Sequence, residues 1–156
     1  MISNWFNAWF TKVHRFAFHR TNGRIGGKLG NSPMALMYTI GAKTGQVRMI
    51  PLQCYPVEPE GILVLASNNG QSRHPGWYYN LKAHPEIDAL VGSERRRVRA
   101  EELGAERRAT EWPEMLKQNR SIEDYKARAG GRELPIFLLR TLKRTSGAGV
   151  ERTGRN

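Results

Sequence analysis

The chain has 156 residues, 39% of them hydrophobic, which is enough for one domain with a closed core. Its formal net charge is +11, so nucleic acid, an anionic membrane surface or a polyanionic small molecule would suit it, unless the charges merely form solvated faces. One cysteine excludes an internal disulfide. Neither that cysteine nor the four scattered histidines stand at metal-ligand spacing, so we expect no metal site.

The first segment, Ser3–Arg20, has apolar residues at helical spacing, with aromatic side chains prominent among them: Trp5, Phe6, Trp9, Phe10 and Phe16. Basic residues lie on or near the other face. This pattern predicts an amphipathic helix within residues 1–21, either packed on the domain or lying on an anionic membrane. The segment lacks the continuous apolar core of a signal peptide. We therefore expect a cytoplasmic protein, with peripheral contact at the inner face of the cell membrane.

Strands dominate the next part of the chain. The glycine-rich segment Asn22–Pro33 is predicted to be a flexible connection rather than a phosphate loop, because no strand precedes it. Predicted strands cover Ala35–Ile40, Val47–Tyr55 and Ile62–Ser67, with turns at Gly41–Gly45 and Pro56–Gly61. Cys54 falls inside the second strand, which indicates a small core residue rather than a nucleophile.

Helices and strands alternate in the remainder. The predicted elements are a short helix from Pro75, a hairpin of Ile87–Val91 and Arg95–Leu103 around Gly92-Ser93-Glu94, a helix over Ala105–Asn119 kinked or restarted at Pro113, a helix over Ile122–Ala129 capped by Ser121, and a strand over Leu134–Leu139. Residues 142–156 have too few apolar side chains to fold and are predicted to be a basic, disordered tail. The order of elements predicts an α+β fold built on a small, largely antiparallel barrel formed by residues 22–141.

Two segments carry candidate binding chemistry. The turn Gly41–Gly45 places Lys43 between glycines, where free backbone N–H groups beside a cation suit a phosphate; a plain hairpin with a solvated lysine is the other interpretation. Arg48 follows this turn, and Arg73 precedes a predicted helix start, which also favours anions. We expect these groups to converge on one polyanion bordered by Trp77.

The two segments together resemble the deazaflavin-dependent nitroreductase family, a group of split β-barrel flavin and deazaflavin oxidoreductases. The matching stretches are Gly41-Ala42-Lys43-Thr44-Gly45, Arg48-Met49-Ile50-Pro51-Leu52, Ala66-Ser67 and Pro75-Gly76-Trp77-Tyr78-Tyr79-Asn80-Leu81, with GRELPIFLL similar to the closing strand. The likeness runs from about Arg20 to Leu139. It implies a split β-barrel that binds reduced coenzyme F-420 and transfers a hydride to a conjugated acceptor such as a quinone, an enone or a nitroaromatic.

The resemblance also implies a set of site residues. The cofactor-binding positions are Lys43, Thr44, Arg48, Met49, Pro51, Leu52, Ala66, Ser67, Asn68, Gly76, Trp77, Tyr78, Tyr79 and Asn80. Ser67 or Tyr125 would donate a hydrogen bond or a proton to the oxyanion that develops on the acceptor, although a structural role suits both equally. Three positions depart from the family pattern: Ala42 replaces an arginine, and Asn119 and Ile122 replace tyrosines found in members that reduce nitroimidazoles.

Two other functions remain open from the sequence. A related split-barrel flavoprotein would bind FMN, which needs phosphate contacts but no partner for a long acidic tail. A non-enzymatic module would use Arg95–Arg99 and the basic tail on nucleic acid, yet these segments lack a nucleic-acid motif and interleaved aromatic residues, so we expect no nucleic-acid partner.

Overall fold

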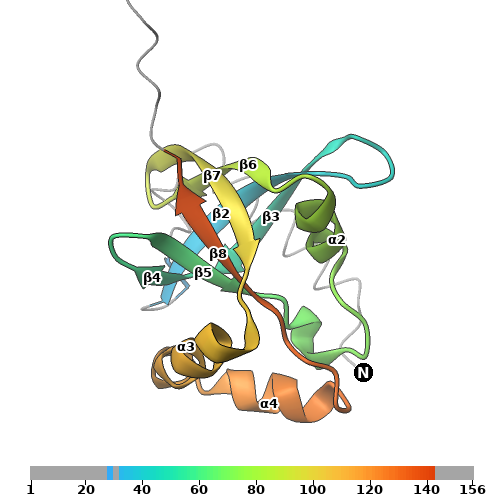
Figure 1. Cartoon of the computed structure of the whole chain (residues 1–156), viewed down its shortest axis with the longest axis vertical. Helices are drawn as coiled ribbons and strands as arrows, with labels where there is room; N and C mark the ends of the chain where they lie inside the picture. The colour runs from blue at the N-terminus through green and yellow to red at the C-terminus, as the bar shows by residue number, and fades with distance from the viewer. Residues whose placement is uncertain (1–27, 30–31, 143–156) are drawn as a thin grey trace, which may run out of the picture.

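The computed structural model describes residues 28–29 and 32–142 (Figure 1). Within them, eight strands form one sheet: β1 (Lys28–Leu29), β2 (Ser32–Ile40), β3 (Val47–Gln53), β4 (Tyr55–Val57), β5 (Gly61–Leu65), β6 (Glu86–Val91), β7 (Glu94–Glu102) and β8 (Ile136–Thr141). The helical elements are the 3-10 turn η1 (Asn68–Gly70), α2 (Gly76–Ala83), α3 (Ala105–Gln118) and α4 (Ser121–Arg128). The predicted N-terminal helix and the tail from residue 143 lie outside the described residues.

The sheet curls because its two edges are joined by a single residue. The strand order is β1-β2-β6-β7-β8-β5-β4, with β3 also paired to β2, and every pairing is antiparallel. The edge strand β3 pairs with β2, and the edge strand β4 pairs with β5 at the other end of the sheet. In the chain, only Cys54 separates β3 from β4. A flat sheet would hold these two strands many ångströms apart, since neighbouring strands are about 4.8 Å from one another. The sheet therefore wraps toward closure, which confirms the predicted antiparallel split barrel.

Strand alternation gives β2 two buried faces. Ala35 and Met37 point into the main core with Trp77 and Phe137, whereas Leu36 joins a smaller cluster on the opposite face. Cys54 belongs to the main core, as predicted, and burial raises the pKa of its thiol to about 12. Such a thiol stays protonated near neutral pH.

A second core lies between the sheet and the helices α3 and α4, which cover one end of the barrel (Figure 1). It contains Leu63 and Leu65 of β5, Met115 of α3 and Ile122 of α4. The helix α2 packs on the main core instead, through Trp77. The two helical groups therefore support different parts of the barrel. No helix among the described residues is long and apolar enough to cross a bilayer.

Several predicted element boundaries are wrong. The predicted turn at Pro56–Gly61 begins as strand β4, because Pro56 has no N–H to lose on an edge strand. Ser121 does not cap α4 with its side chain; its amide instead donates to Asn119 Oδ1 at 3.0 Å. The helix α3 continues through Pro113 without a restart, on an exposed position.

Candidate functional site

The turn between β2 and β3 presents backbone donors beside a cation. Gly41 closes the turn: its amide donates to the Gln46 carbonyl, and its carbonyl accepts from the Gly45 amide, both at 2.8 Å. Gly45 has a φ of 67°, in the left-handed region that glycine favours. The amides of Lys43 and Thr44 donate to no acceptor of the described residues, and both residues are exposed. Two free amides next to an ammonium group suit a phosphate or a carboxylate.

Asn80 of α2 holds this turn in place. Its side-chain oxygen accepts from the Ala42 amide at 3.0 Å, and its side-chain nitrogen donates to Thr39 Oγ1 at 3.1 Å. Thr39 is fully buried, and its hydroxyl donates to the Arg48 carbonyl at 3.3 Å. Asn80 thus joins α2 to β2, β3 and the turn. Because its amide is occupied within the protein, Asn80 fixes the position of the turn Gly41–Gly45.

The predicted cofactor residues of β3 point to both faces of the sheet. Arg48 and Leu52 share one face by strand alternation, and Leu52 packs against the main core that contains Trp77. Met49 packs against the opposite cluster, and Pro51 lies on that same face. The side chains of Arg48 and Leu52 therefore lie on the α2 side of the sheet, and those of Met49 and Pro51 lie on the other side.

A left-handed turn follows β5. Ala66 at the strand end is fully buried. Asn68, Asn69 and Gly70 then have φ values of 48°, 53° and 75°. Asparagine is one of the few residues besides glycine that adopts this conformation readily. The side chain of Asn68 donates to the Arg73 carbonyl at 3.0 Å, which folds the exposed arginine back toward the strand end.

Arg132, which the sequence reasoning missed, organises this loop from the other side. Its guanidinium donates to four backbone carbonyls, those of Ser67 (2.7 Å), Gln71 (2.9 Å), Glu133 (3.1 Å) and Ala66 (3.2 Å), and it lies 3.0 Å from His74 Nδ1. A planar group with five N–H donors holds several carbonyls at once, which a lysine does not. Burial, and then the Arg132 charge, lower the pKa of His74. No local sequence pattern connects Arg132 to partners about 60 residues away.

The three aromatic residues of α2 differ in exposure. Trp77 is only 6% exposed and packs edge-on against Phe137, with ring centroids 6.0 Å apart. Tyr78 is half-buried and stacks on His74 at 4.3 Å. Tyr79 is 52% exposed. Trp77 is therefore mainly a core residue, and the accessible aromatic surface comes from Tyr78, Tyr79 and His74.

The start of α2 is the second place with free backbone donors. Pro75 precedes the helix, and its carbonyl accepts from the Tyr78 amide at 3.1 Å. The amides of Gly76 and Trp77 have no acceptor among the described residues, as expected for the first turn of a helix. Gly76 is exposed, and so is Arg73 just before the helix. This end of α2 favours an anion.

Ser67 and Tyr125 lie on adjoining elements. At Gly70, a Cβ atom would come within 2.7 Å of the Tyr125 carbonyl oxygen and 2.8 Å of Arg128 Cβ, so η1 sits directly on α4. Ser67 precedes η1, and Tyr125 is half-buried with the Arg128 guanidinium 5.3 Å from its ring. The structure therefore brings the two predicted hydrogen-bond donors to one region of the molecule.

The two departures on the helix region of α4 have internal roles. Asn119 Nδ2 donates to Gln53 Oε1 at 2.8 Å and lies 3.4 Å from the Tyr55 hydroxyl. Burial raises the pKa of Tyr55. Ile122 is fully buried in the second core. These positions stabilise the packing of α4 on β3 and β4.

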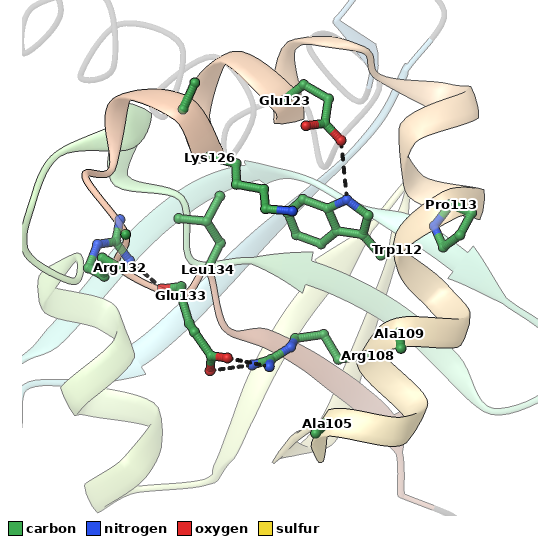
Figure 2. A pocket seen from close by; sticks show the side chains of 12 residues that line it. Ala105, Arg108, Ala109, Trp112, Pro113, Glu123, Lys126, Arg132, Glu133 and Leu134 are labelled. Carbon is green, nitrogen blue, oxygen red and sulfur yellow. Dashed lines mark hydrogen bonds and ion pairs between the residues drawn. The ribbon is translucent and has the colours of Figure 1, made fainter.

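A separate groove of about 720 Å³ lies between α3 and α4 (Figure 2). None of the sequence-predicted site residues lines it. The candidate site is instead a surface made of the turn Gly41–Gly45, the loop Ala66–His74 and the first turn of α2.

Comparison with known proteins assigns a family. The profile of the F420H(2)-dependent quinone reductases matches residues 9–141. An F420H(2)-dependent quinone reductase of Mycobacterium tuberculosis is 42% identical over 85 residues, which cover 54% of this chain and 56% of the relative. A second M. tuberculosis protein with a similar name is 31% identical over 108 residues, covering 69% of this chain and 89% of that protein. The match with the first relative thus spans little more than half of its length.

Solved structures agree with the fold. The F420-H2-dependent reductase FDR-A superposes with a TM-score of 0.62 at 30% identity, covering 69% of this chain and 93% of that one. HutZ, a haem storage protein of Vibrio cholerae, shares the fold alone, with a TM-score of 0.54 at 14% identity. The antiparallel barrel, the paired segments around Lys43 and Trp77 and the profile match lead to one conclusion: the chain belongs to the F420H(2)-dependent quinone reductase family.

Proposed function

We propose that the protein binds reduced coenzyme F-420 on the candidate site and reduces a quinone or another conjugated acceptor. The observation that carries the proposal is the turn at Lys43, where a cation and two free amides are fixed by Asn80. The coenzyme has a phosphodiester and an oligoglutamate tail, so an exposed, positively charged turn fits it. Arg48 and Arg73 add two exposed cations, whereas Ala42 adds no charge and its amide is bound to Asn80.

The residues divide into three roles. Lys43, Arg48 and Arg73 bind negative charge, and the exposed aromatic surface of α2 borders the ring. When bound, the deazaflavin supplies a hydride for a two-electron reduction, while the protein supplies orientation and electrostatics. The hydroxyl group of Ser67 or that of Tyr125 donates a hydrogen bond to the oxygen of the acceptor as negative charge develops on it.

A nucleic-acid function receives little support from the arginine cluster of β7. Arg95 and Arg97 both pair with Asp88, at 2.8 and 3.4 Å. Arg96 and Arg99 pair with the carboxylates of Glu94 and Glu86, at 2.6 and 3.0 Å. Three carboxylates therefore offset most of the charge of these four arginines, which offer less free charge to phosphates than their number suggests.

The test is anaerobic oxidation of reduced F-420 by the purified full-length chain, with menadione, an enone and a nitroimidazole as acceptors. We expect turnover with menadione. Equilibrium binding of oxidised F-420 and of FMN, measured in parallel, separates the two flavin hypotheses. Tighter binding of FMN, or no binding of either compound, would overturn the proposal.

We also propose that the N-terminal segment brings the protein to an anionic membrane, where lipid-soluble quinones reside. The support is its sequence: helical spacing puts aromatic residues such as Trp5 and Trp9 on one face, with Lys12 and Arg15 on or near the other. Co-sedimentation with anionic vesicles, compared between the full chain and a variant lacking residues 1–18, tests it. If the full chain stays in the supernatant, the segment packs on protein instead.

A further inference from the structure

The groove between α3 and α4 takes no part in the proposed function, yet it has the size of a small-molecule site. Its volume is about 720 Å³, within the usual range of ligand pockets. Much of its lining is small or apolar: Ala105, Ala109, Pro113, Ala127, Gly131 and Leu134. Short side chains along both helices leave the space open, and Figure 2 shows longer polar side chains around it.

Trp112 supplies an aromatic wall whose orientation is fixed. Its indole Nε1 donates to Glu123 Oε1 across the two helices at 3.4 Å. Part of the ring packs against the second core, which leaves the remainder facing the groove. The Lys126 ammonium lies 5.3 Å from the ring centroid (Figure 2). The ammonium therefore lies over the indole face at cation–π distance. A flat ligand that stacks on this face displaces the ammonium, and a negative charge on the ligand gives the displaced ammonium a partner.

The charges of the groove leave a positive balance. Arg108 and Glu133 neutralise each other through two hydrogen bonds, at 2.7 and 2.6 Å. Glu123 remains as one negative charge. Lys126 and Arg132 pair with no carboxylate of the described residues, and Arg132 spends its donors on carbonyls and His74. Two cations against one anion favour an anionic ligand.

We propose that the α3–α4 groove is a second ligand site, for a small planar aromatic or conjugated molecule with one carboxylate. The ring stacks on Trp112, and the carboxylate pairs with Lys126, whose exposed and flexible side chain lets the ammonium follow it. The small residues of α3 and α4 accommodate the edge of the ring. None of the predicted cofactor-binding residues lines this site, although Arg132 lines it and also holds the loop Ala66–His74. The proposal does not depend on the proposed function.

The test uses 2-naphthoate as the probe and 2-naphthylmethanol as its neutral counterpart, titrated calorimetrically into the full chain without cofactor. We expect naphthoate to bind about fivefold or more tightly than the alcohol. Lys126→Gln should weaken naphthoate binding about fivefold and abolish the preference for the acid. Lys117→Gln changes an exposed lysine of α3 that does not line the groove. It should leave the affinities for the acid and the alcohol within about twofold of their original values.

The location is checked by amide chemical-shift changes and by competition. Naphthoate should shift the amides of Ala109 and Ala127, and saturating F-420 should not displace it. Trp112→Phe, which preserves most of the apolar burial, should weaken binding while the fold stays intact. Equal affinity for acid and alcohol, no binding of either, or shifts confined to the Lys43 turn and α2 would each overturn the proposal. Displacement by F-420 would do the same.

Discussion

Arg132 is the residue on which the loop after β5 depends most, because one guanidinium reaches Ala66, Ser67, Gln71 and His74. In Arg132→Lys the charge remains but the fork of donors is lost, so two or three hydrogen bonds worth about 1 kcal/mol each disappear. We expect the unfolding free energy to fall by about 1–3 kcal/mol and F-420 binding to weaken about tenfold. Urea unfolding and a binding titration measure the two effects.

The matched control is Arg108→Lys, which changes an exposed pair with Glu133 and should cost about 1 kcal/mol or less. If both variants behave alike, the contacts of Arg132 carry no special weight. Unchanged stability and F-420 binding in Arg132→Lys would lead to the same conclusion.

Lys43→Ala tests the anion-binding turn. Lys43 is exposed at the tip of the turn, so its removal should leave the stability unchanged. Loss of a charge-assisted contact should cost about 1.5–3 kcal/mol of binding free energy, or roughly 10- to 150-fold in the dissociation constant for F-420. Lys117→Ala, on the exposed face of α3, provides the comparison. An unchanged dissociation constant would mean that Lys43 is merely solvated.

At the residue scale, the sequence supports predictions about local chemistry and misses long-range contacts. The pattern around Lys43 was readable because glycines and a lysine within five positions define the turn. The hydrogen bonds of Asn80 reach residues about 40 positions away in the chain, and those of Arg132 reach residues more than 60 positions away. Such partners depend on how the barrel closes, which no short sequence window contains.

At the scale of elements, the contact between η1 and α4 depends on Gly70. Gly70→Ala forces a Cβ into a left-handed position and to within 2.7 Å of the Tyr125 carbonyl oxygen. Backbone strain costs about 1–2 kcal/mol, and the displacement of α4 adds to it. We expect the unfolding free energy to fall by about 2 kcal/mol or more, measured by urea denaturation. The displaced α4 should also alter turnover, because it carries Tyr125.

Gly45→Ala is a matched control for that variant. Gly45 has a φ of 67°, close to the 75° of Gly70, but a Cβ there would have no atom within 4 Å. In Gly45→Ala the unfolding free energy should therefore fall by about 1–2 kcal/mol, from backbone strain alone and with no steric clash. A loss at Gly70 no greater than at Gly45 would contradict the close packing of η1 on α4.

Element prediction succeeded where periodicity was strong and failed at prolines and caps. The hairpin of β6 and β7 was predicted almost to its ends, because the turn Gly92-Ser93-Glu94 marks where its strands meet. The three-residue edge strand β4 was not predicted as a separate strand. Cys54, which separates it from β3, was included in the predicted strand, and Pro56 was assigned to a turn. The cap of α4 was misassigned: Ser121 donates its own amide to the Asn119 side chain instead of accepting an amide with its hydroxyl.

At the scale of the whole molecule, ion pairs join elements that are distant in the chain. Glu60, just before β5, accepts from Arg107 of α3 and from Arg140 of β8. Arg140 also pairs with Glu101 of β7. This network connects α3 to β7, to β8 and to the turn before β5. It also shows that much of the excess of arginine in the sequence is used in paired contacts within the fold.

Acidification from neutral pH should first affect His74. Burial and the Arg132 charge lower its pKa below the ordinary value of about 6.5. The unfolded chain therefore takes up this proton at a higher pH than the folded protein, and stability falls as the pH drops below about 6.5. Urea unfolding between pH 7.5 and 5.5 measures the decline. In His74→Gln the decline should be smaller, and an identical pH dependence in both proteins would contradict the assignment.

The carboxylates respond at lower pH. Hydrogen bonds from Arg107 and from Arg108 lower the pKa of Glu60 and Glu133, and one from Arg95 lowers that of Asp88. Each folded pKa lies below the unfolded value of about 4, so the unfolded state binds more protons in this range. The stabilisation is complete above about pH 5 and is lost as the pH falls through the folded pKa values. Unfolding free energies measured from pH 5 to pH 3 should therefore fall, by a modest amount because these pairs are exposed to solvent. In Glu60→Gln the unfolding free energy should depend less on pH, because this carboxylate no longer titrates. Stability that rises below pH 4, or a pH dependence unchanged by the substitution, would show that the Glu60 network contributes nothing to folding.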